Sequence, residues 1–469
     1  MRGPRVGAAL LVLLAASARA DDLLWHVTGV ALGPRAVCRD GDSLCDRDGR
    51  ADGACSFGVA LCRDGTVASS VRVRGAGAAA VRQALAALAA DATCTPEVPV
   101  LVRAGRRARL VAAGQSERRR LRLTCSRAPR PRAVVVTTDF ETGLLATVGV
   151  PPPHRVTHPT TPIHSDAVVR VAGDRVYIVN RFLGDNLQVL DPRRGLATLL
   201  QCSTGPGSNP HDVAVLAPDK AYVTRYDAKE LWVVDPSAAS CAAFLRATVD
   251  LSPWGDADGL PEMDQMALVG DRLFVSLERL DRARGFAPSG RSRLAVIDTE
   301  TDAVTAAVDL SGANAFGDAS GLVREPGTGK LVIAEAGNVL KKGDGGLERV
   351  DPYTLQADGA FFVDENQLGG NVLDFVLLSA TKGYAVLQDA SLQNRLVDFD
   401  PTGARAPRTV YSRQAYLPDI ALGPDGLLWL ADQGLPDPGI RLFDTTTDRP
   451  VLHGPLNVGL PPFSIGFLP

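Results

Sequence analysis

The chain has 469 residues and a net charge of −3. Beyond the first twenty residues, no stretch is apolar for long enough to cross a bilayer, so the sequence predicts no membrane-spanning helix there. The charge is unevenly spread: residues 21–132 carry 19 Lys/Arg against 11 Asp/Glu, whereas residues 133–469 carry 28 against 42. The opposite signs predict two modules that can attract each other.

The first twenty residues have the pattern of a signal peptide. Arg2 and Arg5 precede the apolar run Ala8–Leu14, and Ala18–Ala20 has the small-x-small pattern that signal peptidase cleaves. We therefore expect cleavage after Ala20 and a mature protein in the periplasm or outside the cell.

Residues 21–130 are predicted to form a small, mainly β domain with one helix. Ala78–Asp91 is rich in Ala and Leu, which favours a helix. The Pro- and Arg-rich residues 127–132 end the domain, because neither a helix nor a central strand tolerates such a stretch. Short strands are expected at Val71–Val73, Val98–Val102, Leu110–Ala112 and Leu121–Leu123.

Eight cysteines agree with export, because disulfides persist in oxidising compartments. Six of them lie in the N-terminal module, whose pairing the spacing does not fix. Two lie in comparable outer parts of neighbouring repeats further on, where either a disulfide or two free thiols is possible. The disulfide candidates are Cys38, Cys45, Cys55, Cys62, Cys94, Cys125, Cys202 and Cys241.

The N-terminal module also contains Asp residues that alternate with Gly. Such spacing lets several carboxylates fold back on one ion, which predicts a calcium site. The run from Asp46 to Cys55 resembles the calcium-binding thrombospondin type-3 repeat; Arg50, in a ligand position of an EF-hand, departs from that other motif. The alternative is an Asp-Gly hairpin between disulfides. The candidate ligands are Asp40, Asp42, Asp46, Asp48 and Asp52.

Residues 101–132 contain 11 Arg and a single acidic residue, Glu117. No aromatic residue is interleaved with them, which argues against nucleic acid as the partner. We expect this basic face to meet an anionic glycan, another component of the cell envelope or the acidic second module. The alternative is a solvated edge that resists aggregation.

Residues 131–469 repeat, and the repeat predicts a β-propeller. Six copies end in a turn that begins with Asp followed by Pro or Thr, spaced 44, 63, 53, 49 and 44 residues apart, the length of a four-stranded blade. Asp favours the turn because it can bond the backbone two residues on. The turn aspartates are Asp191, Asp235, Asp298, Asp351, Asp400 and Asp444.

The pieces left at the two ends of this module, Ala133–Val150 and Pro462–Pro469, would form a seventh blade. Such a blade closes the ring and removes exposed strand edges. The expected fold is therefore all-β: a seven-bladed propeller at residues 131–469, preceded by the small disulfide-rich domain.

The repeat resembles the YVTN-type repeat of bacterial and archaeal surface-layer propellers. The resemblance rests on the runs Tyr177–Asn180 with Leu187–Asp191, and Tyr222–Arg225 with Leu231–Asp235. It covers roughly residues 133–469 and implies a fold rather than an activity. Families of this kind include binding and adhesion proteins as well as lactonases built on similar rings.

Each repeat begins with a polar residue that we expect to face the central channel. Five carboxylates around one axis would repel unless they are solvated, protonated or bridged by a cation. Hard oxygen ligands suit Ca²⁺, and no organic cofactor is implied. The alternative is that each Asp caps the backbone of its own blade. The predicted ring consists of Asp166, Asp212, Asp264, Ser320, Asp374, Asp419 and Ser464.

No catalytic residues are predicted. His164, Ser165 and Asp166 are adjacent and cannot form a triad, because successive strand residues point to opposite faces. His164 and His211 lie beside the ring and are acid/base candidates; the alternative is a structural role in which each bonds its Asp neighbour or a loop carbonyl. Insertions at Trp254–Glu262 and Leu280–Arg293 widen the third repeat with loops of the kind that often bind.

We therefore expect an exported, monomeric, non-enzymatic binding protein, with calcium stabilising one or both modules and a protein or anionic glycan as partner. The alternative is a metal-dependent hydrolase of the propeller-lactonase kind that uses the acidic ring and His211.

Overall fold

The computed structural model describes residues 131–317, 322–339, 341 and 343–468 in full, and the backbone of nine strands, β1 to β9, within residues 1–130. The chain divides into two compact units, Met1–Arg130 and Pro131–Pro469. No helix among the described residues is both long and apolar enough to cross a membrane.

The strands of the first unit form two sheets. The order is β1-β3-β2-β9 in one sheet and β5-β4-β6-β7-β8 in the other. Two expected strands coincide with β6 and β7, whereas the expected Leu121–Leu123 spans the end of β8 and the start of β9. The bounds are β1 Leu10–Leu11, β2 Leu23–Val27, β3 Val30–Leu32, β4 Cys55–Leu61, β5 Val67–Ser70, β6 Val98–Ala104, β7 Ala108–Ala112, β8 Gln115–Leu121 and β9 Leu123–Arg127.

Several predictions for this unit lie outside the described residues. They are the helix at Ala78–Asp91, the strand at Val71–Val73, the calcium ligands Asp40, Asp42, Asp46, Asp48 and Asp52, and the side chains of the six N-terminal cysteines. They remain predictions.

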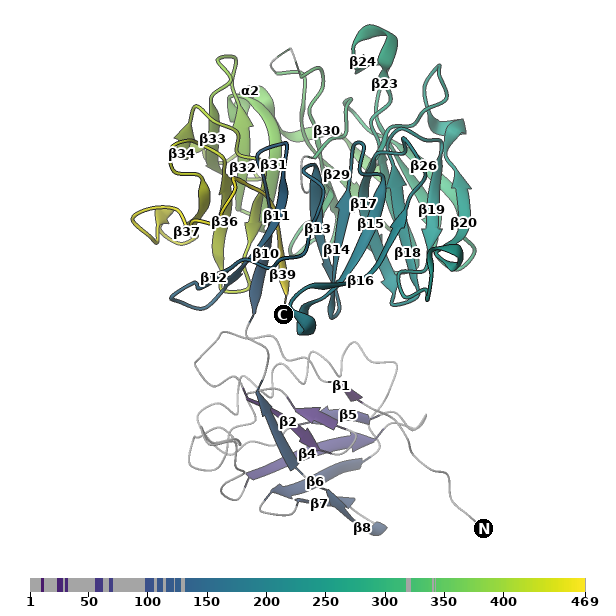
Figure 1. Ribbon diagram of the computed structural model, residues 1–469, viewed down its shortest axis with the longest axis vertical. Helices are drawn as coiled ribbons and strands as arrows, with labels where there is room; N and C mark the ends of the chain where they lie inside the picture. The colour runs from purple at the N-terminus through teal and green to yellow at the C-terminus, as the bar shows by residue number, and fades with distance from the viewer. Residues whose placement is uncertain are drawn as a thin grey trace. The chain divides into compact units, whose positions relative to one another are not determined.

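The second unit is a seven-bladed propeller, which confirms the predicted fold class (Figure 1). Blades 1 to 3 are regular four-stranded antiparallel sheets, and blade 3 carries an additional two-stranded hairpin. Blade 1 comprises β13 Ala167–Ala172, β14 Arg175–Asn180, β15 Asn186–Asp191 and β16 Ala197–Ser203; blade 2 comprises β17 Pro210–Ala217, β18 Lys220–Arg225, β19 Glu230–Val234 and β20 Leu245–Asp250; blade 3 comprises β21 Met263–Val269, β22 Arg272–Leu277, β25 Arg293–Asp298 and β26 Ala303–Asp309, with β23 Leu280–Asp281 and β24 Ala287–Pro288 as its hairpin.

Blades 4 to 6 repeat this plan, and blade 7 combines both ends of the unit. There, β39 pairs antiparallel with β10, so that the last strand of the chain lies beside the first strand of the propeller. The bounds are β27 Leu322–Arg324, β28 Leu331–Glu335, β29 Gly346–Asp351 and β30 Gln356–Asp364 in blade 4; β31 Asn371–Ser379, β32 Lys382–Gln388, β33 Asn394–Phe399 and β34 Arg408–Arg413 in blade 5; β35 Ile420–Leu422, β36 Leu427–Asp432, β37 Gly439–Asp444 and β38 Arg449–Pro450 in blade 6; and β39 Pro462–Leu468, β10 Arg132–Thr138, β11 Gly143–Gly149 and β12 Val156–Thr157 in blade 7.

Burial along each blade explains the composition of its strands. The second and third strands are packed on both faces by neighbouring blades, so β14 and β15 are buried at five of their six positions and read as almost continuous apolar runs. The outermost strand β16 is instead exposed at four of its seven positions and buried only at Cys202. The core is therefore a series of layers between blades, and not one central cluster.

The six predicted turn aspartates all cap the turn that follows them. Asp298, for example, accepts hydrogen bonds from the backbone nitrogens of Glu300 and Thr301 at 3.1 and 2.8 Å. These bonds lower the pKa of Asp298, the bond from Thr301 most strongly. Equivalent bonds are made by Asp191, Asp235, Asp351, Asp400 and Asp444.

Two faces of the propeller follow from this connectivity. The hairpin face carries the turns between first and second and between third and fourth strands. The loop face carries the links between second and third strands and the links between blades. In Figure 1 the β23–β24 hairpin, part of the insertion expected in the third repeat, stands out from the upper, loop face. The short helix α2, Glu365–Leu368, precedes blade 5.

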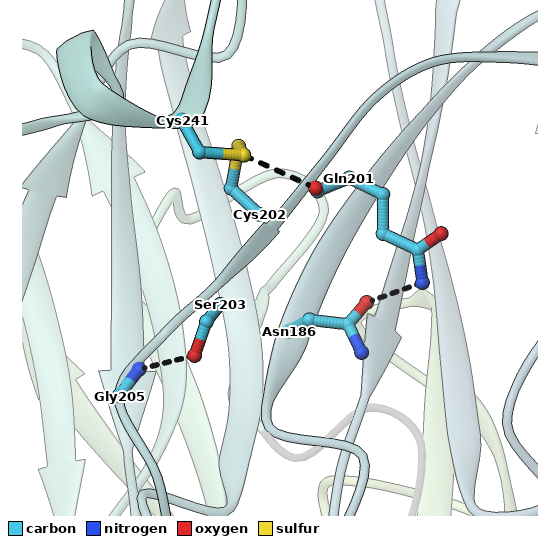
Figure 2. Close-up of a disulfide and its surroundings, with 6 residues drawn as sticks. All are labelled: Asn186, Gln201, Cys202, Ser203, Gly205 and Cys241. Carbon is cyan, nitrogen blue, oxygen red and sulfur yellow. Dashed lines mark hydrogen bonds between the residues drawn. A yellow bond between two sulfur atoms is a disulfide. The ribbon is translucent and has the colours of Figure 1, made fainter.

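A disulfide joins blades 1 and 2. Cys202 lies in β16 and Cys241 begins a 3₁₀ turn between β19 and β20, with their Cα atoms 5.3 Å apart (Figure 2). Of the two possibilities that the sequence left open for this pair, the structure therefore has the disulfide.

Candidate functional site

The first strands of the blades carry the predicted ring, and the strand register shows which of its members are equivalent. Asp212, Asp374 and Asp419 each lie two residues before the residue that pairs with a large aromatic side chain of the second strand. The three pairs are Ala214 with Tyr222, Val376 with Tyr384, and Ala421 with Trp429.

Counted in the same way, Val168 and Gln265 occupy this position in blades 1 and 3. Asp166 and Asp264 therefore lie two residues and one residue before it, so the structure gives a different alignment of the repeats from that of the sequence. Ser320 lies outside the described residues.

The aspartates at the aligned position connect their blade to the next one. Asp212 Oδ2 accepts a hydrogen bond from Met266 N at 2.9 Å, and Asp374 Oδ2 accepts one from Ile420 N at 2.9 Å. Asp212 and Asp374 also accept a bond from the backbone nitrogen of the following residue in their own blade. Each of these carboxylates thus accepts hydrogen bonds from backbone amides of two blades. The sequence-based alternative expected bonds to the backbone of the same blade alone.

The same link continues through the blade that closes the ring. Asp419 Oδ2 accepts from Ile465 N at 2.6 Å, and Ser464 Oγ accepts from Val169 N at 3.2 Å. All of these acceptor side chains are buried. The ring therefore has a structural role in holding blades together, because a buried backbone N–H needs an acceptor.

Three ring carboxylates are paired with cationic or imidazole side chains of the protein. Arg170 Nε lies 2.6 Å from Asp212 Oδ1, and Arg181 Nη2 lies 2.6 Å from Asp166 Oδ1. His211 Nδ1 lies 2.9 Å from Asp264 Oδ1. Among the fully described residues, no three His, Cys, Asp or Glu side chains converge in a way that could hold a metal ion.

His211 belongs to a polar cluster on the loop face of blades 2 and 3. Its ring stacks on Tyr226 with centroids 4.2 Å apart, and the Tyr226 hydroxyl donates to Glu278 Oε2 at 2.8 Å. Burial and the charge of Asp264 raise the pKa of Glu278 well above its usual range. The cluster thus combines an imidazole, a carboxylate and a buried carboxyl group that favours its protonated form.

A second buried carboxyl group lies next to this cluster. Glu262 Oε1 accepts from Arg282 Nε at 3.0 Å, and Arg282 Nη1 lies 2.6 Å from Asp227 Oδ1. Burial raises the pKa of Glu262 to about 7, and Arg282 opposes that rise only in part. Arg282 precedes the β23–β24 turn and so connects the projecting hairpin to blade 2.

A different surface lies on the loop face where blades 7 and 1 meet. Phe140, Phe182 and Leu183 expose 60, 57 and 76% of their surface around a cavity of about 500 Å³. Arg181 reaches this cavity with its guanidinium 5.1 Å from the centre of the Phe463 ring. We call this surface the aromatic rim; it consists of Phe140, Arg181, Phe182, Leu183, Tyr416 and Phe463, with His164, Ser165 and Asp166 completing the cavity wall.

Ring contacts and hydrogen bonds with buried or partly buried residues fix the side chains of the aromatic rim. Phe463 is buried and makes edge or tilted ring contacts with Phe140 and Tyr416, at 6.4 and 6.3 Å between centroids. Asp166 accepts from Arg181 Nε at 2.8 Å and from Phe182 N at 3.3 Å, which fixes the loop that carries Phe182. The predicted ring residue Asp166 therefore positions exposed aromatic side chains instead of contacting the next blade.

Comparisons with known proteins support the fold. No protein-family model matches the chain, and no curated protein is detectably similar to it in sequence. Among solved structures, it is similar to a candidate 6-phosphogluconolactonase from Bacteroides fragilis, with 13% identity and a TM-score of 0.51 over 72% of this chain and 98% of that one. A candidate 6-phosphogluconolactonase from Bacteroides uniformis gives 13% identity and 0.51 over 72 and 100%. At this identity the likeness shows the propeller fold alone.

Proposed function

We propose that this protein is an exported, non-enzymatic binding protein that presents the loop face of its propeller to a partner protein. The aromatic rim carries the proposal. Exposed Phe140, Phe182 and Leu183 surround a cavity whose floor, Phe463, is buried and fixed. Exposed apolar patches rimmed by polar residues are typical of interaction sites.

The composition of the aromatic rim favours a protein partner. Aromatic residues and Arg contribute most of the binding energy at protein interfaces, and they act best where the free surface is already ordered. Arg181 is held by Asp166 and by the Phe463 ring, so little freedom would be lost when a partner covers it. The seven-bladed ring supplies the rigid support.

Site-specific cross-linking tests this proposal. A photoreactive benzoylphenylalanine in place of Phe182 should give one discrete adduct with a partner in the native cell envelope. Adding the second substitution Phe140→Ala should remove that adduct. The control is the same probe in place of Tyr353, an aromatic residue that is 67% exposed in a turn of the hairpin face. Equal labelling from both positions would contradict the proposal.

The hydrolase remains the second candidate, because one observation favours it. The bond between His211 Nδ1 and Asp264 orients the imidazole and leaves Nε2 as the nitrogen that could exchange a proton with a substrate. A panel of lactones and phosphoesters, assayed with and without divalent ions, tests this candidate. Turnover that His211→Ala abolishes while Phe182→Ala leaves it unchanged would favour the hydrolase over the binding protein.

Calcium stabilisation of the N-terminal module is a separate part of the proposal. It is supported by the close spacing of Asp40, Asp42, Asp46, Asp48 and Asp52, with Gly41 between the first two and Gly49 between the last two. A ligand that binds the folded state raises its melting temperature, so EDTA should lower the temperature at which this module unfolds. An unchanged melting temperature would remove this part and leave the binding proposal intact.

A further inference from the structure

In several blades the first residue of the second strand is Lys or Arg, and in most of these its side chain forms a hydrogen bond with the next blade. The side chain donates to a backbone carbonyl in the turn of the next blade that begins with a turn aspartate. The four crossing bonds are Lys220 Nζ to Thr299 O at 2.8 Å, Arg272 Nη1 to Pro352 O at 2.9 Å, Lys382 Nζ to Thr445 O at 2.6 Å and Arg132 Nη2 to Pro192 O at 3.3 Å.

At two of these junctions the cation acts together with a tyrosine two residues later. Between blades 2 and 3, the Tyr222 hydroxyl donates to Asp302 Oδ1 at 2.5 Å, and Lys220 Nζ lies 2.8 Å from the same oxygen. Between blades 5 and 6, Tyr384 and Lys382 hold the carboxylate of Asp448 in the same way. We call each such set of tyrosine, lysine and aspartate a clamp.

The junction between blades 1 and 2 has the tyrosine and the cation of a clamp but lacks its carboxylate. Arg175 and Tyr177 occupy the two positions in β14. The turn of blade 2 that faces them presents Pro236, Ser237 and Ala238. Arg175 instead pairs with Asp174 in its own hairpin at 2.9 Å, and in the described structure the Tyr177 hydroxyl makes no hydrogen bond.

A cavity of about 530 Å³ lies at this junction, on the hairpin face. Its volume is within the range of small-molecule sites. Leu199, Leu200, Val215 and Leu216 supply apolar walls, and the Arg175 guanidinium and the Tyr177 ring lie in the lining. Asp174 and Arg175 are the charged residues of the lining, and they pair with each other. Arg193, outside the lining, lies 3.3 Å from the Asp174 carboxylate, so Asp174 has a second cationic partner besides Arg175.

We propose that this cavity binds a carboxylic acid with an apolar chain, of the size of a medium-chain fatty acid. Its carboxylate accepts from Arg175 and the Tyr177 hydroxyl the bonds that Asp302 and Asp448 accept in the two clamps. Its chain lies against the leucine and valine walls. The two clamps support this proposal. At the equivalent position in each clamp, a tyrosine hydroxyl and a cationic side chain of the second strand bind a carboxylate of the protein itself. The proposal concerns the hairpin face and does not depend on partner binding at the aromatic rim.

Titration of the intact protein with octanoate, followed by calorimetry, tests the proposal, with octanol as the uncharged control ligand. We expect saturable binding of octanoate that is at least about tenfold weaker for Arg175→Gln, because this variant loses a charge-assisted hydrogen bond to the carboxylate. Ala238→Asp should weaken binding as well, because its own carboxylate would compete for Tyr177 and Arg175. Lys220→Gln, the equivalent change at a clamp, should leave octanoate binding unchanged.

Three outcomes would overturn the proposal: no saturable binding of octanoate to the wild type, equal affinity for octanol, or unchanged octanoate affinity in Arg175→Gln. If Arg175→Gln does not fold, Ala238→Asp decides the question, because it adds a small side chain at a surface turn and removes no contact of the core. Unaltered octanoate binding in Ala238→Asp would then contradict the site.

Discussion

Two junctions between neighbouring blades of the propeller are held together by different interactions. Between blades 5 and 6, Asp374 Oδ2 accepts from Ile420 N, and the clamp around Asp448 holds the opposite face. Between blades 1 and 2, the position equivalent to Asp374 is Val168, the clamp has no carboxylate, and a disulfide joins Cys202 to Cys241. The disulfide thus joins two blades whose junction lacks both the interblade aspartate and the complete clamp that are found between blades 5 and 6. Polar contacts at this junction include the ion pair of Arg170 with Asp212 and a hydrogen bond from Arg225 Nε to Thr204 O at 2.7 Å.

The largest effect is expected from removing the disulfide. The double variant Cys202→Ser with Cys241→Ser opens a link between residues 39 apart in sequence, which the loop-entropy model values at about 4 kcal/mol of unfolding free energy. Denaturant unfolding of the double variant measures the loss. Chemical reduction is not equivalent, because it would also act on the six other cysteines. A loss below about 1 kcal/mol would mean that apolar packing and the Arg170 ion pair hold this junction without the disulfide.

Asp374→Ala should give the next largest effect. It leaves the backbone nitrogens of Ile420 and Phe375 without the acceptor they have now, and an unsatisfied buried donor costs about 1–3 kcal/mol. Asp166→Ala is the matched control, since Asp166 is partly exposed and its carboxylate accepts hydrogen bonds from Arg181 and Phe182 of its own blade. Equal losses of unfolding free energy in the two variants would argue against the interblade role of the ring.

Replacing each of three equivalent tyrosines with Phe compares the stability that the hydroxyl contributes at three junctions. Tyr222→Phe and Tyr384→Phe each remove a hydroxyl that donates to a carboxylate, at a cost of about 1 kcal/mol of unfolding free energy or somewhat more. Tyr177→Phe removes a hydroxyl that has no hydrogen bond in the described structure and should change the unfolding free energy by only a few tenths of a kcal/mol. Equal costs at the three positions would show that the clamps contribute nothing beyond ring packing.

The repeat could be predicted from the sequence because its signals are local. A turn Asp that bonds the backbone two residues on needs only its neighbours, so Asp298 and its equivalents marked the blades correctly. The Cys202–Cys241 pair could be expected because both lie in outer parts of neighbouring blades. The roles of Asp264 and Asp166 could not be predicted, because an Asp one or two residues before the aligned position fits the repeat pattern equally well. Only the strand register separates these residues from Asp212.

Contacts between segments that are distant in the sequence could not be predicted either. His211 and Asp264 are 53 residues apart, and their contact depends on how blades 2 and 3 pack. The aromatic rim is assembled from a hairpin of blade 7, a loop of blade 1 and the segment before blade 6. No period or motif connects Phe140 to Tyr416. What could have been noticed is Phe182 beside Leu183 in a loop, since two adjacent large apolar residues there call for an explanation.

The smallest effect concerns the pH dependence of a clamp. Burial alone would raise the pKa of Asp448, but hydrogen bonds from Tyr384 and Lys382 and the nearby charge of Arg408 hold it below its usual value. A carboxyl group whose pKa is lowered by folding stabilises the protein above its unfolded pKa, and that contribution is lost as the pH falls through the folded pKa. The cost of Tyr384→Phe should therefore be smaller at about pH 3 than at about pH 6.

Denaturant unfolding of the wild type and Tyr384→Phe at these two pH values measures that difference, and Tyr177→Phe is the control. Tyr177 has no carboxylate bonded to its hydroxyl among the described residues, so its small cost should be the same at both pH values. The comparison between variants cancels the titration of all other carboxyl groups, which act on each protein alike. A cost of Tyr384→Phe that does not fall in acid would mean that the clamp acts through hydrogen-bond geometry alone, with no contribution from the charge of Asp448.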